Sequence, residues 1–206
     1  MRKVILYIAT SLDGYIADYN GDVNWLSGQD QSNTEQGSYP EFIETIDTVI
    51  LGYKTYHKVV TELSPDIWVY KGKQSYVITN RNIENKEEIT FTNKNLEELI
   101  LNLKKQEGKN IWICGGASIV NQLLELNLID EFCISIIPTI LGDGISLFDK
   151  HTKERKLELV STRTYNGIVD LWYKNRRGCI KITFDTSRIR KGGFEFESSL
   201  LHIILL

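Results

Sequence analysis

A chain of 206 residues with 42% hydrophobic and 25% charged side chains is ordinary for a globular protein and long enough to bury one sizeable core. Its formal net charge of −3 gives no basic footprint for nucleic acid, and no stretch reaches the roughly 20 apolar residues that span a bilayer. Cys114, Cys133 and Cys179 form no CxxC or Cys/His cluster, so we expect no metal site and reduced thiols in a cytoplasmic protein.

The first predicted elements are a buried strand and a long loop. Residues 4–10 are apolar on both faces and rich in β-branched and aromatic side chains, which predicts a central strand covered on each side. Residues 11–26 contain two glycines and several Asp and Asn residues, a composition typical of a structured loop. The loop also holds more apolar surface than a connector needs, Trp25 included, so it could fold over a ligand. Residues 27–38 are polar and predict a loop or a helix with a solvated face.

Helices and strands then alternate. In chain order we predict a short helix opened by Pro40, a buried strand at 47–52, a helix at 53–60, a strand at 74–79 and a short strand near 89–91. Asn95 is then expected to cap a helix, because Glu98 three residues later resembles a capping box and apolar residues follow at helical spacing.

The stretch 111–124 predicts a strand, a tight turn at Gly115 and Gly116, and a helix. Glycines allow a sharp turn and a close approach of ligand to backbone, and the unpaired N–H groups at a helix start suit a phosphate. The alternative is a turn that only lets the helix pack on its strand. Gly52 repeats the same order of strand, glycine and helix earlier in the chain.

The last predicted elements are antiparallel. A strand at 130–138 and a glycine loop at 140–148 precede two alternating segments, 156–164 and 168–174, and the Asn166-Gly167 pair between these segments is a strong hairpin signal. We therefore predict an α/β protein whose mostly parallel central sheet is flanked by helices and ends in an antiparallel hairpin.

The predicted domain covers 1–177, and 178–206 is left as a C-terminal appendage. That segment contains a strand-like run, a basic glycine-containing stretch and an apolar end. It could add an edge strand, mediate association, be poorly ordered or be prone to aggregation.

Five motifs occur in the order and at the spacings of a known family: 11–17, 21–26, 50–56, 114–118 and 141–144. Together they resemble the dihydrofolate reductase-like superfamily. The most similar branch contains the C-terminal reductase domain of the bacterial bifunctional riboflavin-biosynthesis deaminase-reductase and its small stand-alone relatives. The resemblance covers roughly residues 2–176. No G-x-G-x-x-G opens the first strand–helix turn, which argues against the doubly wound dinucleotide-binding fold.

The resemblance implies that the protein binds NADPH. The implied pyrophosphate cradle consists of Gly115, Gly116, Ala117, Ser118, Ile119 and Val120. The implied second phosphate contact consists of Gly52, Tyr53, Lys54 and Thr55. The implied adenosine end lies near Thr79, Asn80 and Arg81. The nicotinamide ring would be flanked by Ala9 and Ile16.

Two basic side chains are candidates for the 2′-phosphate that distinguishes NADPH from NADH. Lys54 could meet this phosphate as a point charge, and Arg81 is the better candidate. Either residue could equally be an ordinary solvated charge.

The substrate and proton sites are less well defined. Trp25, Tyr39, Phe42 and Tyr56 are predicted to line an aromatic slot for a flat heterocycle, with plain core packing as the alternative for each. Asp13 is the only acid inside the first family motif and is the candidate catalytic residue. Its alternative role is a turn residue that caps the loop through backbone N–H groups.

The sequence departs from two branches of the family. Folate-reducing relatives carry a carboxylate on the helix before the Gly52 strand, whereas the only acid here, Glu41, is not clearly in register. The riboflavin-pathway reductases are usually fused to a zinc deaminase, whose H-x-E and P-C-x-x-C signatures this chain lacks. The sequence also shows no basic cluster near Trp25 or Phe42 to hold a ribose phosphate.

We therefore expect an NADPH-dependent reductase that transfers a hydride to a small planar, pterin- or pyrimidine-like substrate. One alternative is the 5-amino-6-(5-phosphoribosylamino)uracil reductase of riboflavin biosynthesis, and another is an NADPH-binding protein without turnover. The closing hairpin offers a sheet edge and an apolar face, so we expect a homodimer with no nucleic-acid or membrane partner.

Overall fold

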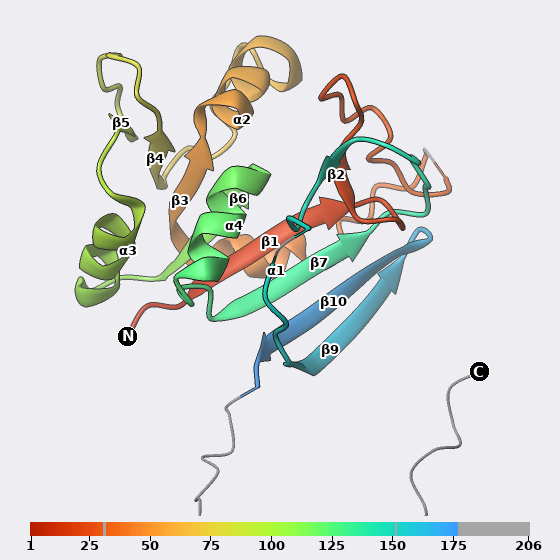
Figure 1. Ribbon diagram of the computed structural model, residues 1–206. Helices are drawn as coiled ribbons and strands as arrows, with labels where there is room; N and C mark the ends of the chain where they lie inside the picture. Colours follow the sequence, from red (N-terminus) through yellow and green to blue (C-terminus); the bar gives the residue numbers. More distant parts are fainter. Residues whose placement is uncertain (31, 151, 177–206) are drawn as a thin grey trace, which may run out of the picture. The chain divides into compact units, whose positions relative to one another are not determined.

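The long strands form one eight-stranded sheet (Figure 1). The computed structural model describes residues 1–30, 32–150 and 152–176, so the predicted appendage, 178–206, lies outside the described residues. In spatial order the strands are β5 (Ile89–Thr92), β4 (Gln74–Ile78), β3 (Ile46–Gly52), β6 (Asn110–Gly115), β1 (Val4–Thr10), β7 (Glu131–Ile136), β10 (Ile168–Asn175) and β9 (Leu157–Tyr165).

The strands from β5 to β7 run parallel, and β10 and β9 close the sheet in antiparallel pairing. β1 lies between β6 and β7, which confirms the prediction of a central strand. Asn166 and Gly167 turn the hairpin with φ of 46° and 76°, the conformation that this dipeptide favours. The predicted mostly parallel α/β sheet with a closing hairpin is therefore confirmed.

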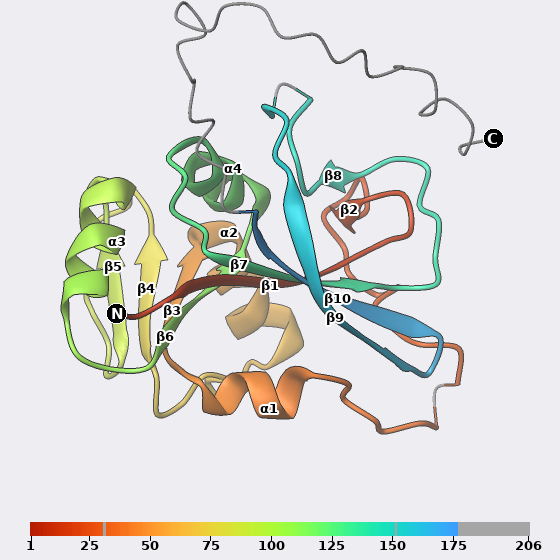
Figure 2. The ribbon, with the colours of Figure 1, turned by 90° about the horizontal axis from the view of Figure 1, so that it is seen from below.

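Helices cover both faces of the sheet, and Figure 2 shows α1 (Tyr39–Glu44) and α4 (Ala117–Glu125) on opposite sides. Alternate residues of β1 point to the two faces, so Leu6 packs in the cluster under α4 and Tyr7 in the cluster with Phe42 of α1. The remaining helices are α2 (Tyr53–Lys58), the π-helix η1 (Val59–Leu63) and α3 (Leu96–Lys105). None of the helices in the described residues is long and apolar enough to cross a membrane.

The predicted cap of α3 is confirmed. The side chain of Asn95 accepts a hydrogen bond from the N–H of Glu98 at 3.1 Å. The apolar residues predicted at helical spacing are buried against the sheet: Leu96, Leu99, Ile100 and Leu103.

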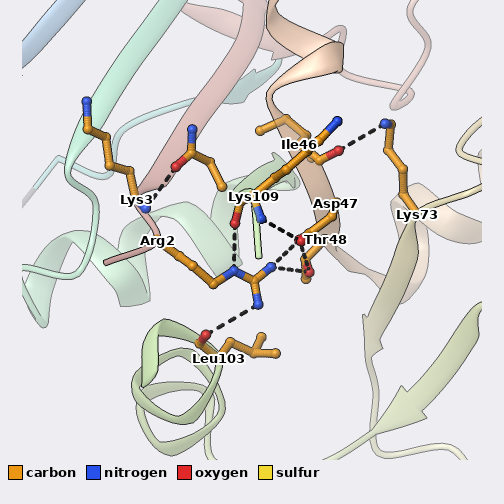
Figure 3. Close-up of polar contacts among 9 residues, drawn as sticks. Arg2, Lys3, Ile46, Asp47, Thr48, Lys73, Leu103 and Lys109 are labelled. Atoms are coloured by element: carbon orange, nitrogen blue, oxygen red, sulfur yellow. Dashed lines mark hydrogen bonds and ion pairs between the residues drawn. The ribbon is translucent and has the colours of Figure 1, made fainter. Parts of the chain in front are cut away.

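A buried arginine joins four segments at the amino ends of the strands (Figure 3). The guanidinium of Arg2 donates to the carbonyl oxygen of Lys109 at 2.6 Å, to that of Leu103 at 3.3 Å and to Oγ1 of Thr48 at 2.6 Å. It also forms an ion pair with Asp47. These partners come from β3, the end of α3 and the turn before β6. Arg2 therefore fixes the start of β1 against all three.

Two loops at the opposite edge are joined by a second, two-stranded sheet that the sequence did not reveal. β2 (Tyr15–Ala17) pairs antiparallel with β8 (Ile145–Ser146). Both segments lie inside stretches predicted as separate glycine-rich loops. The stretch after β1 is therefore attached to the stretch after β7.

The polar segment 27–38 is attached to the hairpin tip. Gln29 N donates to the carbonyl of Asn166 at 2.9 Å, and Asp30 N donates to Oδ1 of Asn166 at 2.8 Å. At the other end of the segment, Ser38 N donates to Oδ2 of Asp170 at 3.0 Å. Most of its side chains are solvated, as predicted, but its backbone fixes the start of α1 relative to β10.

Candidate functional site

Two glycine turns meet at the carboxyl edge of the sheet. β3 and β6 are neighbouring parallel strands; β3 ends at Gly52, which begins α2, and Gly116 directly after β6 begins α4. A Cβ atom on Gly116 would lie 3.5 Å from Oγ1 of Thr55, and one on Gly52 would lie 3.8 Å from the backbone nitrogen of Gly116. The two segments predicted to contact phosphate are therefore in contact with each other.

The starts of α2 and α4 favour an anion. The first N–H groups of an α-helix have no intrahelical acceptor and carry the positive end of the helix dipole. Neither helix has an acidic side chain in its first turn. Gly115, with φ of 124°, turns the chain in a conformation that L side chains rarely adopt. A bare backbone with free donors is what a pyrophosphate requires.

Arg81 and Tyr53 join the third predicted segment to the second. The guanidinium carbon of Arg81 lies 4.5 Å from the centre of the Tyr53 ring. The N–H of Arg81 donates to Oγ1 of Thr79 at 3.1 Å, which shapes the turn after β4 that also contains Asn80. Arg81 and Lys54 are both exposed, and among the described residues neither forms an ion pair.

The residues predicted beside the nicotinamide lie on β1 and β2. Ala9 is half-buried near the carboxyl end of β1, directly opposite Ser135 of β7. Ile16 is half-buried in β2 and packs against the core cluster that α4 covers.

Asp13 is held as an ionised carboxylate between two loops. It accepts hydrogen bonds from Ser11 Oγ at 2.6 Å, from Gly142 N at 2.7 Å and from Leu141 N at 3.1 Å. These bonds, with the Ser11 hydroxyl contributing most, lower the pKa of Asp13 to about 2. Such a group carries no proton to donate at neutral pH. The geometry therefore argues against the catalytic assignment and favours the alternative of a loop-capping residue.

The four aromatic residues predicted to form one slot differ in burial: two lie in the core and two are half-buried. Phe42 and Tyr56 are 3% and 5% exposed. Phe42 stacks on Tyr7 with ring centres 4.5 Å apart, and Tyr56 packs in the core that Phe42 shares. These contacts favour core packing for both residues, in place of an open slot. Trp25 and Tyr39 remain half-buried.

A row of aromatic rings that sequence reasoning missed crosses the same face of the sheet. Neighbouring ring centres are 5.1 to 6.0 Å apart along the row Tyr56, Trp68, Tyr70, Trp112 and Tyr39. Alternation in β6 places Cys114 on the face that carries Trp112. The Sγ atom of Cys114 lies 3.2 Å from the hydroxyl of Tyr70, and burial raises the pKa of this thiol to about 11. A neutral thiol therefore lies against the middle of the row, one residue before the glycine turn.

Glu41 points away from this row, in agreement with the predicted departure from folate-reducing relatives. Its exposed carboxylate pairs with Arg163 of β9 at 3.3 Å. The carboxylate that is buried on this face is Asp170 of β10, which is 0% exposed. Only its place in an alternating strand marked it in the sequence, and alternation does not distinguish a buried acid from a solvated one.

Comparison with known proteins identifies the family. Residues 2–169 match the family model of the RibD C-terminal domain. The uncharacterised protein YwjB of Bacillus subtilis is 42% identical over 175 residues, which cover 84% of this chain and 97% of YwjB.

Two solved structures share the architecture. A candidate riboflavin biosynthesis protein of Shewanella sp. PV-4 superposes with a TM-score of 0.73 at 28% identity, covering 85% of this chain and 99% of that one. The diaminohydroxyphosphoribosylaminopyrimidine deaminase/5-amino-6-(5-phosphoribosylamino)uracil reductase of Thermotoga maritima gives a TM-score of 0.63 at 17% identity, covering 85% and 57%. The chain thus has the dihydrofolate reductase-like α/β fold and belongs to the RibD C-terminal domain family.

Proposed function

We propose that this protein is an NADPH-dependent reductase that transfers a hydride to a small planar, pterin- or pyrimidine-like substrate. The observation that carries the proposal is the contact between the Gly52 and Gly116 turns, where two acid-free helix starts meet on neighbouring strands. Family membership supports it, because the reductase domain of this family uses NADPH. Bound NADPH supplies the hydride, and the chain supplies binding, orientation and exclusion of water.

Preference for NADPH over NADH is assigned to the two free cations at the adenosine end. Arg81 is held over Tyr53, with its guanidinium available for bidentate contact with a phosphate. Lys54, next to Tyr53, adds a second positive charge from α2. Thr79 fixes the Arg81 turn, and Asn80 lies inside that turn.

The loop 11–26 is assigned the task of excluding water from the reacting atoms. Asp13 attaches one end of the loop to the backbone of Leu141 and Gly142. Near the other end, Asp22 forms an ion pair at 2.8 Å with Lys58, the last residue of α2. The loop thus connects the segment after β7 with α2. Fixed in this way, it covers the end of β1, where Ala9 would meet the nicotinamide.

Two other functions are supported by particular observations. Membership of the RibD C-terminal domain family favours 5-amino-6-(5-phosphoribosylamino)uracil reductase activity as the second candidate. The ionised state of Asp13 leaves no proton donor assigned, which keeps an NADPH-binding protein without turnover as the third.

We also propose a cytoplasmic homodimer that associates through β9. This edge strand is exposed along most of its length, and Leu157, Leu159 and Val160 are 36%, 52% and 57% exposed. A long exposed edge strand with apolar side chains pairs readily with another chain. Sedimentation should give a dimer, and a Val160→Lys variant should shift it to a monomer; a wild-type monomer would rule the proposal out. The free thiols of Cys114 and Cys133 fit a reducing compartment.

The decisive experiment measures NADPH binding and oxidation separately. Titration with NADPH and NADH, followed through tryptophan fluorescence, should show tighter binding of NADPH. A panel of pterins, pyrimidines and quinones should then reveal NADPH oxidation with at least one planar acceptor. Binding without oxidation by any acceptor would favour the non-catalytic alternative, and a protein that binds neither nucleotide would refute the proposal.

The cradle itself is tested by Gly116→Val, with Gln122→Val on the exposed side of α4 as its control. A Cβ atom at Gly116 has room in the free protein, because it would lie at an ordinary contact distance, 3.5 Å, from Oγ1 of Thr55. It would stand where a pyrophosphate approaches the backbone, so NADPH affinity should fall at least about tenfold, the effect of losing one charge-assisted hydrogen bond. Unchanged affinity in folded Gly116→Val would remove the cofactor assignment.

A further inference from the structure

A histidine that the proposed function does not use lies beside the Tyr53 ring. The imidazole centre of His57 is 5.8 Å from the centre of that ring, and the guanidinium carbon of Arg81 is 4.5 Å from the same point. Tyr53 and His57 are four residues apart on α2, so they share one face of the helix. Lys54 follows Tyr53 and lies three residues before His57. Three exposed basic residues are therefore neighbours.

No acid neutralises these three side chains. Among the residues that the structure describes, Arg81, Lys54 and His57 form no ion pair. By contrast, Lys58, the remaining basic residue of α2, has two acidic partners at 2.8 Å. The three neighbours thus differ from Lys58 in lacking a counter-charge.

The other charged groups around α2 are accounted for. They are Asp22 of the loop 11–26, Glu62 of η1, and Glu84, Lys86, Glu87 and Glu88 of the connection between β4 and β5. Lys58 holds the first two, and Lys86 donates to the hydroxyl of Tyr56 at 3.0 Å. The neighbouring strands β3 and β4 carry one charged side chain, Asp47, which pairs with Arg2 at the opposite end of β3.

Such a cluster is suited to an anion. Like charges one turn apart on a helix repel each other, and an aromatic ring orients a cation without neutralising it. A bound anion would remove this repulsion. A phosphate monoester carries close to two negative charges at neutral pH, so it can interact with more than one of the three cations.

His57 differs from its two neighbours because its charge depends on pH. Arginine and lysine stay protonated throughout the physiological range, whereas histidine exchanges its proton between about pH 5 and 8. The cluster therefore has two fixed positive charges, on Arg81 and Lys54, and a third that is present in acid and disappears as the pH rises.

We propose that His57 is a third specificity-determining residue for the 2′-phosphate of NADPH, and that its protonation makes the preference for NADPH over NADH dependent on pH. This inference rests on the proposed function, because it takes the 2′-phosphate to lie at Arg81 and Lys54. The protonated imidazole donates a charge-assisted hydrogen bond to a phosphate oxygen, and the neutral ring adds no charge. The contribution of His57 is therefore greatest in acid and absent in alkali.

The test measures the binding of NADP⁺ and NAD⁺, which differ only in the 2′-phosphate and, unlike NADPH, survive in acid. Titration calorimetry from pH 5.5 to 8.5 gives the ratio of the two affinities. Relative to His57→Gln, wild type should prefer NADP⁺ about three- to tenfold more strongly at the acid end and equally at the alkaline end, as expected of a partly solvated ion pair.

Two further variants complete the comparison. His57→Lys, whose charge is permanent, should keep the stronger preference at every pH. Lys71→Gln, at an exposed lysine away from Tyr53 in the turn before β4, should follow wild type. The phosphate itself loses its second proton near about pH 6, but this is common to all forms of the protein and cancels in the comparison.

A second readout follows the proton on His57. If protonation strengthens NADP⁺ binding by some factor, NADP⁺ must favour protonation by the same factor. The titration midpoint of the imidazole C–H signal that is missing from the NMR spectrum of His57→Gln should therefore rise by about 0.5–1 pH unit with NADP⁺. It should not rise with NAD⁺.

The outcomes separate this inference from the proposed function. Equal preferences in wild type and His57→Gln at every pH would overturn the inference. So would a difference that does not change with pH, because packing of the ring on Tyr53 has no such dependence. In both cases binding of NADP⁺ and NADPH still supports the proposed function. Failure of the wild type to bind any of these nucleotides would instead refute the proposed function.

Discussion

The guanidinium of Arg81 lies 4.5 Å from the centre of the Tyr53 ring, so the turn after β4 and the first turn of α2 are in contact. A cation over the face of an aromatic ring is held in one orientation without its charge being neutralised. Because no acid among the described residues pairs with Arg81, its charge remains available for a ligand phosphate.

Arg81→Gln should therefore weaken NADPH binding by about tenfold or more and leave NADH binding unchanged, because a charge-assisted hydrogen bond contributes about 1.5–3 kcal/mol. Nucleotide titration of both forms checks this. Lys71→Gln, at an exposed lysine in the turn before β4, is the control and should alter neither affinity. Equal losses for NADPH and NADH would show that Arg81 supports the fold of the site and does not recognise the 2′-phosphate.

Asp13 predicts a pH dependence of stability at the acid end. Its pKa in the folded protein, about 2, is below its ordinary value of 3.8, so its contribution is fully present above pH 4 and disappears as the pH falls toward 2. The difference in free energy of unfolding between wild type and Asp13→Asn should shrink over this interval. Urea unfolding at pH 5, 4, 3 and 2 measures it.

The control for this prediction is Asp66→Asn, since Asp66 is exposed and makes no hydrogen bond in the described residues. The difference in free energy of unfolding between wild type and Asp66→Asn should stay constant with pH. A reductase activity that keeps its rate and pH profile in Asp13→Asn would agree with a loop-capping role. A steep loss of turnover with unchanged stability would return Asp13 to the catalytic assignment.

Arg2 should be among the most sensitive polar residues of the fold. Arg2→Met leaves Asp47 without its ion pair and the Lys109 carbonyl without its side-chain donor, so we expect a loss of about 2–4 kcal/mol in the free energy of unfolding. Lys3→Met is the neighbouring control. Lys3 is 55% exposed and pairs with Glu131 at the surface, so it should cost less than about 1 kcal/mol. Similar losses for both variants in urea unfolding would contradict the role given to Arg2.

Local pattern was sufficient for the regular elements of this fold. The strand 4–10, the capped helix after Asn95 and the hairpin at Asn166-Gly167 depend on periodicity and turn chemistry within a few residues, and all three are present. The pairing of β2 with β8 joins residues about 130 positions apart through very short strands, and such strands have no periodicity of their own.

The site shows the same division. The two glycine turns are visible in sequence, because each follows a buried strand and precedes a helix, and the fold brings them together. Burial of side chains is not visible in the same way. Phe42 and Tyr56 are residue types that could line a ligand slot, but they pack in the core. Asp170 is a residue type that is usually solvated, but it is fully buried. These outcomes depend on which elements cover each face.

The difference in burial between Phe42 and Tyr39 can be tested with two variants on α1. Phe42→Ala removes a ring stacked on Tyr7 and should cost about 3–5 kcal/mol in the free energy of unfolding, the usual effect of emptying a buried aromatic site. Tyr39→Phe removes a hydroxyl that donates to no described residue and should change stability by less than about 0.5 kcal/mol. Unfolding in urea measures both, and binding of a pterin such as lumazine to the NADPH-loaded protein should weaken in Tyr39→Phe and stay unchanged in folded Phe42→Ala. A large stability loss in Tyr39→Phe would place this residue in the core beside Phe42.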